Sequence, residues 1–152
     1  MTTIVWDGLT LATDSQANCG HHKAGKHVKK LWRNIGPFKA VALSGDVAAF
    51  PIVLDVFDSM EPGTPSMSLD VEGVVLDEDH VAWEFDGKHW TFTRMPKHSA
   101  HGSGWALATA AMKGGADAVS ALKITCELDL YSGGRVQKFT VKKPADGKRS
   151  GS

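Results

Sequence analysis

The second residue of the chain, Thr2, is a candidate nucleophile. A threonine hydroxyl attacks poorly without a base, but a terminal threonine carries its own base in the α-amine, whose reference pKa is roughly 7.7–8.0. Because Thr2 is small, we expect Met1 to be removed, which would expose nucleophile and base in one residue. Taken alone, Thr2 is better explained as the β-branched start of a strand, so the hypothesis depends on the residues around it.

Five segments supply those companions, and their order resembles that in the bacterial HslV peptidase and in proteasome β subunits. The segments are TTIV (2–5) followed by ATDSQ (12–16), HVKKL (27–31), ALSGDVAAF (42–50), GSG (102–104) and DLYSGG (129–134). Each segment alone occurs by chance in many proteins. Five in this order over residues 2–141 are similar to an N-terminal-nucleophile hydrolase of the proteasome type.

The resemblance implies a role for each of three residues beside Thr2. Lys30 would lower the pKa of the Thr2 amine, because a fixed positive charge disfavours a second cation. Asp14 would pair with Lys30 and keep it charged, and the Gly45 backbone N–H would donate to the oxygen of the tetrahedral intermediate. Asp14 and Lys30 could instead be a surface pair, as most such charges are.

Three further residues, Ser103, Asp129 and Ser132, would hydrogen-bond around the Thr2 amine and hydroxyl and orient them, as the third member of a catalytic triad does. Ser103 could also be a helix cap. Lys29 competes with Lys30 for the catalytic role. In an alternating strand the two lysines point to opposite faces, so only one of them can reach Thr2.

The resemblance implies a threonine-type endopeptidase that works on peptides or unfolded proteins without a cofactor. It also implies a homo-oligomeric ring, expected as a double hexamer, and a possible AAA+ unfoldase partner. The alternatives are a catalytically silent, ring-forming structural or binding subunit, and a non-peptide amidase of the wider group. The chain is shorter than typical HslV in the middle, where residues 62–69 replace much of a helix that makes ring contacts in the family.

These residues need strands and helices to position them, and turn signals divide the chain into such elements. Asp7-Gly8 and Asp86-Gly87 predict hairpins, and Pro51 predicts a late start or a kink in one helix. We expect strands at 2–6, 9–13, 27–33, 38–44, 73–76, 81–85, 89–93 and 135–141, helices at 47–60, 103–113 and 117–128, and loops at 17–26 and 61–69.

Segregated strands and helices indicate an α+β fold. The resemblance makes this a four-layer αββα sandwich, with two antiparallel sheets between helix layers. We expect one domain over residues 1–141 and a flexible polar tail over residues 142–152.

The composition excludes several other classes of protein. Seventeen basic and seventeen acidic residues cancel, which argues against a partner such as nucleic acid or a membrane surface. The first residues do not read as a signal peptide, and no apolar run has the length of a membrane span. We therefore expect a cytoplasmic protein of a bacterial or phage-infected bacterial cell, with Cys19 and Cys126 as free thiols.

The histidines do not predict a metal site. The chain has seven of them, and both Cys19 with His21-His22 and the pair His98 and His101 have ligand-like elements. Neither set has the complete spacing of a recognised site. We interpret them as loop residues, and no cofactor or metal is expected.

Overall fold

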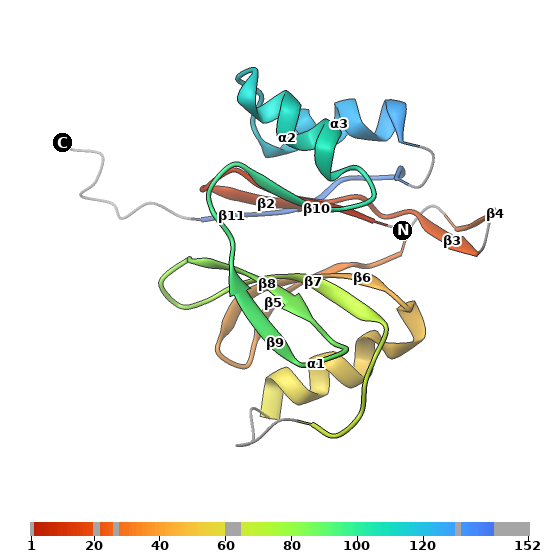
Figure 1. Ribbon diagram of the computed structural model, residues 1–152, viewed down its shortest axis with the longest axis vertical. Helices are drawn as coiled ribbons and strands as arrows, with labels where there is room; N and C mark the ends of the chain where they lie inside the picture. Colours follow the sequence, from red (N-terminus) through yellow and green to blue (C-terminus); the bar gives the residue numbers. More distant parts are fainter. Residues whose placement is uncertain (1, 20–21, 26–27, 60–64, 130–131, 142–152) are drawn as a thin grey trace.

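The computed structural model describes residues 2–19, 22–25, 28–59, 65–129 and 132–141, which form four stacked layers (Figure 1). A pair of helices lies on one outer side, a single helix lies on the other, and two antiparallel sheets lie between them. The predicted αββα sandwich is therefore confirmed. The predicted tail at 142–152 lies outside the described residues.

The first sheet has the strand order β10-β1-β2-β11, and all its neighbouring strands are antiparallel. Its strands are β1 (Thr3–Trp6), β2 (Thr10–Thr13), β10 (Ser99–Gly102) and β11 (Gln137–Thr140). Helices α2 (Trp105–Lys113) and α3 (Ala118–Leu128) cover its outer face. Because side chains alternate along a strand, β1 packs Val5 under the helices and Ile4 against the other sheet.

The second sheet has the order β5-β6-β7-β8-β9 and is also antiparallel. Its strands are β5 (Leu31–Ile35), β6 (Phe38–Gly45), β7 (Val71–Leu76), β8 (Ala82–Asp86) and β9 (Thr91–Arg94). Helix α1 (Phe50–Ser59) follows the 3-10 turn η1 (Val47–Ala49) and packs Val53 and Phe57 on the outer face. An apolar layer that includes Leu31 and Val74 fills the space between the two sheets.

Helix starts follow the capping residues of the sequence. Asp46 accepts a hydrogen bond from Ala48 N at 3.1 Å, and Asp117 accepts one from Ser120 N at 2.8 Å. Pro51 lies in the first turn of α1, where its missing N–H is tolerated. The late start predicted from Pro51 is thus confirmed, and residues 47–49 form a 3-10 turn instead of helix.

Three predictions about the elements were wrong. Residues 17–26 are not simply a loop, because β3 (Ala17–Cys19) and β4 (His22–Gly25) form a two-stranded sheet. The strand expected at 27–33 begins only at Leu31. Strand β10 was missed, because its sequence SAHG lacks the β-branched residues and the alternation that indicate a strand. None of the described helices is long and apolar enough to cross a membrane.

Candidate active site

Thr2 lies directly before β1, in the interior of the molecule, with only 3% of its surface exposed. Lys30 lies directly before β5 of the other sheet, and its Nζ donates a hydrogen bond to Thr2 Oγ1 at 2.6 Å. Within the described part of the chain, the Thr2 hydroxyl makes no other hydrogen bond. The two sheets therefore bring together a hydroxyl and an amine that lie 28 residues apart in the sequence.

Asp14 holds the other side of the Lys30 ammonium group. The distance from Lys30 Nζ to Asp14 Oδ1 is 3.1 Å, and both side chains are almost fully buried. Lys30 also donates to the carbonyl oxygen of Gln16. Burial lowers the pKa of Lys30, and the charge of Asp14 opposes that shift. Burial likewise raises the pKa of Asp14 against the opposing effect of Lys30. The ammonium group is thus held against the Thr2 hydroxyl by a carboxylate and a carbonyl oxygen.

Backbone groups from two elements hold the Asp14 carboxylate in place. Oδ2 accepts a hydrogen bond from Gly133 N at 3.0 Å, and Oδ1 accepts one from Thr3 N at 3.4 Å. Ser15 N donates to Gly133 O at 3.1 Å, so the segment at Asp14 and Ser15 and the backbone of Gly133 are joined by two hydrogen bonds. The alternative of a surface pair between Asp14 and Lys30 does not apply, because Asp14 is 0% and Lys30 1% exposed.

Ser103, Asp129 and Ser132 form a hydrogen-bonded cluster beside β1. Asp129 Oδ2 accepts from Ser103 Oγ at 2.6 Å and from Ser132 Oγ at 2.7 Å. The cluster contacts Thr2 through the backbone, because Ser103 N donates a hydrogen bond to the carbonyl oxygen of Thr2 at 3.0 Å. Ser103 is not the helix cap, since Gly104 occupies the N-cap position of α2.

Thr3 links this cluster to β1, and the sequence analysis gave it no role. Its Oγ1 lies 2.7 Å from Ser132 Oγ and accepts a hydrogen bond from Gly104 N at 2.9 Å. Thr3 is fully buried, so each of these bonds is made away from water. The sequence does place a second threonine next to the candidate nucleophile, but the partners of its hydroxyl lie 101 and 129 residues away.

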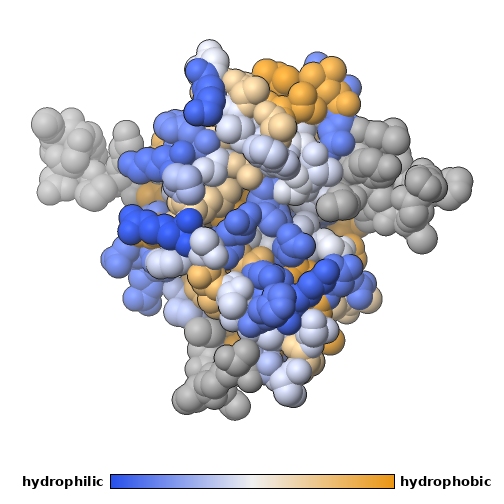
Figure 2. All heavy atoms as spheres, viewed as in Figure 1, coloured by the Kyte–Doolittle hydropathy of each residue, from blue (hydrophilic) through white to orange (hydrophobic). Residues whose placement is uncertain are grey.

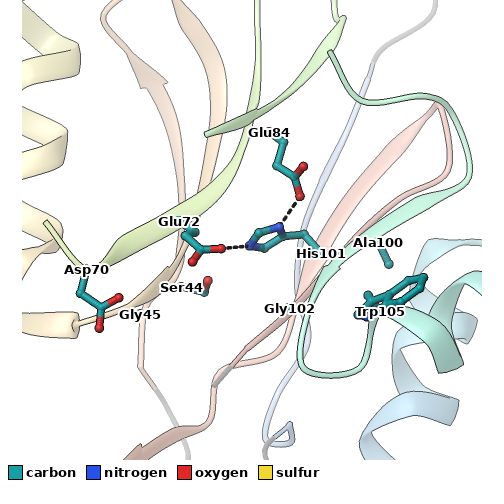
Figure 3. Close-up of a pocket in the computed structure, with 9 residues that line it drawn as sticks. All are labelled: Ser44, Gly45, Asp70, Glu72, Glu84, Ala100, His101, Gly102 and Trp105. Atoms are coloured by element: carbon teal, nitrogen blue, oxygen red, sulfur yellow. Dashed lines mark hydrogen bonds and ion pairs between the residues drawn. The ribbon is translucent and has the colours of Figure 1, made fainter. Parts of the chain in front are cut away.

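Gly45 lies apart from the hydrogen-bonded cluster, on the wall of a cavity of about 500 Å³ (Figure 3). Gly102 lines the same cavity, and a Cβ at Gly102 would lie 1.7 Å from the Thr2 carbonyl oxygen. Both glycines have positive φ angles, +107° and +103°, which side chains rarely adopt. The cavity therefore extends from Gly102, which packs against the Thr2 carbonyl oxygen, to Gly45.

Lys29 is exposed, whereas Lys30 is buried against Thr2. The resemblance had implied Lys30. Strand alternation does not separate the two lysines, because neither of them lies in β5. Lys30 is directed inward by the interactions of its backbone, which include Lys30 N to Gln137 Oε1 at 3.0 Å and Leu43 N to Lys30 O at 2.9 Å.

In the part of the chain that the structure describes, Cys126 and the candidate metal ligands lack the activating contacts that surround Thr2. Burial raises the pKa of the Cys126 thiol to about 11, with Asp14 and Asp129 adding to the shift. Such a thiol stays protonated at neutral pH and reacts slowly. No group of three or more His, Cys, Asp or Glu among the described residues is arranged to hold a metal ion. The side chains of Cys19 and His21-His22 lie outside the described part.

Comparison with solved structures defines the class of fold. The structure of Thiobacillus denitrificans BPH, a bacterial proteasome homologue, superimposes with a TM-score of 0.68 at 21% sequence identity, over 95% of this chain and 99% of that chain. BPH in complex with epoxomicin superimposes with a TM-score of 0.68 at 20% identity, over 95% of this chain and 100% of that chain. No protein-family model and no curated protein matches the sequence. The chain has the fold of a proteasome-type N-terminal-nucleophile hydrolase.

Proposed function

We propose that this protein is a threonine peptidase that hydrolyses peptide bonds with Thr2 as the nucleophile after removal of Met1. The observation that carries the proposal is the buried contact between Lys30 Nζ and Thr2 Oγ1 at 2.6 Å, with Asp14 behind the lysine. A hydroxyl needs a partner of this kind to act as a nucleophile. A buried lysine that points at a threonine has little structural value, since an apolar pair would fill the same space without the cost of desolvation.

The reaction would proceed in two stages, formation of an ester on Thr2 and hydrolysis of that ester. Thr2 Oγ1 attacks the carbonyl carbon of the substrate, and the hydroxyl proton passes to the free α-amine of Thr2. The tetrahedral intermediate collapses to an ester on Thr2, and the departing amine takes that proton. A water molecule then hydrolyses the ester, releases the carboxylic acid and restores the Thr2 hydroxyl.

The neighbouring groups would support these steps by charge and position. Lys30 donates to Thr2 Oγ1 and favours the oxygen as it loses its proton. The N–H of Gly45 would donate to the oxyanion on the wall of the cavity, where its positive φ angle re-aims the backbone at the end of β6. Ser103, Asp129, Ser132 and Thr3 would keep the Thr2 backbone in place through the bonds described above.

Covalent trapping tests this function directly. A peptide epoxyketone forms a ring with both the hydroxyl and the amine of a terminal threonine, and the solved BPH structure contains epoxomicin, which favours this probe. The intact protein should have lost the mass of Met1, and tryptic mass spectrometry should place one inhibitor on Thr2. Cys126 should stay unmodified, because its thiol has a raised pKa.

Two outcomes would contradict the proposal. Retention of Met1 in protein from a normal host would leave no free amine and remove the chemical basis of the mechanism. A processed protein with free Thr2 that neither reacts with the probe nor cleaves any peptide, even with a candidate unfoldase, would favour a silent ring-forming or binding subunit instead.

We also propose that the protein assembles into a closed double ring of hexamers, with an AAA+ unfoldase as a possible partner. The helix layer carries large apolar side chains that are exposed, namely Leu107, Ile124 and Leu128. Figure 2 shows an apolar patch over this layer, and such patches commonly mark interfaces. Sedimentation velocity should give one large species at micromolar concentration. A monomer alone under these conditions would be inconsistent with a ring.

A further inference from the structure

The cavity beside Thr2 is built from both sheets and from the start of a helix (Figure 3). Ser44 comes from β6, Glu72 from β7, Glu84 from β8 and His101 from β10, while Trp105 begins α2. The proposed reaction uses Gly45, but it gives no task to these side chains. They form a site whose chemistry can be considered separately.

Negative charge dominates the walls of this cavity. Asp70, Glu72 and Glu84 line it, and its described lining includes no lysine or arginine. His101 Nε2 lies 3.2 Å from Glu72 Oε2, and its Nδ1 contacts Glu84 (Figure 3). The carboxylate of Asp70 makes no hydrogen bond or ion pair with any described residue. Three carboxylates outnumber the single imidazole, so acidic groups predominate in the cavity.

A second feature of the cavity is a buried hydroxyl without a partner. Ser44 is 7% exposed and lines the cavity, and no residue that the structure describes hydrogen-bonds to its side chain. Figure 3 shows Ser44 below Glu72, with Gly45 on one side of it and His101 on the other. Buried polar groups are normally satisfied, so an unused hydroxyl that faces a cavity indicates a water molecule or a ligand group there.

Trp105 supplies the third feature, an aromatic ring at the rim. It is 58% exposed, although large aromatic side chains are usually covered. A tryptophan face attracts a cation within about 6 Å of the ring, and carboxylates reinforce that attraction. Acidic walls and a free hydroxyl suit a ligand group with a positive charge, and the indole offers an apolar surface at the end of the cavity opposite Asp70 (Figure 3).

We propose that this cavity binds the lysine or arginine side chain of a peptide substrate, at a position adjacent to the scissile bond. The inference rests on the proposed function, because the cavity runs from the Gly102 contact with Thr2 to Gly45. A peptide whose carbonyl lies between Thr2 and Gly45 must place a neighbouring side chain into this space or across its mouth. The charged head would face Asp70.

Peptides that differ only in the charge of one side chain test whether the cavity selects for positive charge, because the shape of the side chain stays the same. Quenched fluorescent peptides would carry arginine or its neutral isostere citrulline, in turn on each side of the cleaved bond, and the assembled full-length protein would be used. On one side, kcat/KM for arginine should exceed that for citrulline by about tenfold. Asp70→Asn should reduce this ratio by about threefold or more, since it removes one charge from an exposed residue. Asp55→Asn, which changes an exposed carboxylate on α1, is the matched control and should leave the ratio unchanged.

Equal kcat/KM for arginine and citrulline on both sides would overturn the inference, as would a ratio that Asp70→Asn does not change. Free arginine amide would also overturn the inference if it inhibited cleavage with an inhibition constant as low as the KM of the arginine peptide. The cavity would then be a site for small cations. Binding of the same peptides to Thr2→Ala protein, measured by calorimetry, separates the two proposals. If arginine peptides bind selectively but the processed wild type does not hydrolyse them, the cavity would still be a site for basic side chains and the proposed peptidase function would be wrong.

Discussion

Thr2→Ala is expected to lower peptide hydrolysis to background, a loss of at least about 10³-fold in kcat, because it removes the attacking oxygen. The fold should survive. The substitution removes only a hydroxyl and a methyl, and Lys30 keeps its contacts with Asp14 and with the Gln16 carbonyl. The measurement is the initial rate on a fluorogenic peptide, with the sedimentation profile as evidence that the protein still assembles.

Thr2→Ser is the matched variant for this experiment. It keeps the hydroxyl and the amine but loses the methyl that restricts the side-chain rotamer, and a small misplacement of a nucleophile can cost up to about 10²-fold in rate. We therefore expect activity between that of the wild type and that of Thr2→Ala. Full activity in Thr2→Ala would show that another residue attacks, and the role assigned to Thr2 would be wrong.

The second large effect is expected at Lys30. Lys30→Ala should abolish cleavage, because it removes the donor 2.6 Å from Thr2 Oγ1. Lys29→Ala is the control, since Lys29 is an exposed neighbour of the same type and should retain most of the activity. Steady-state rates for the two variants, measured side by side, decide which lysine participates. Reversed effects would show that the register around residues 28–31 is wrong.

Stability must be followed in the same variants. Lys30→Ala leaves the carboxylate of Asp14 buried without its ion-pair partner, and breaking such a pair costs about 3–5 kcal/mol. The double variant Lys30→Met with Asp14→Asn removes both charges and keeps most of the volume, so it should unfold at a higher urea concentration than Lys30→Ala. Because it lacks the amine, it should also be inactive. An inactive but stable double variant would show that the loss of activity is chemical and not a consequence of unfolding.

Local signals in the sequence predicted much of the fold. The Asp7-Gly8 turn between two β-branched runs predicts the β1–β2 hairpin, and its register, with Ile4 opposite Thr13, is regular. Asp46 and Asp117 predict helix starts by capping. Strand β10 could not be predicted in this way, because SAHG becomes a strand only when β1 offers it an edge to pair with.

The sequence by itself determined the order of the motifs, the candidate nucleophile at Thr2 and the set of residues that could support it. Those features depend on residue type and on spacing along the chain. Only the tertiary structure gave the contact between Lys30 Nζ and Thr2 Oγ1, joined Thr3 to the cluster of Ser132, and placed Gly45 on an acidic cavity. Each of these contacts joins residues from different sheets or from distant segments. Their partners are chosen by packing and by burial of charge in the assembled fold, which no local pattern encodes.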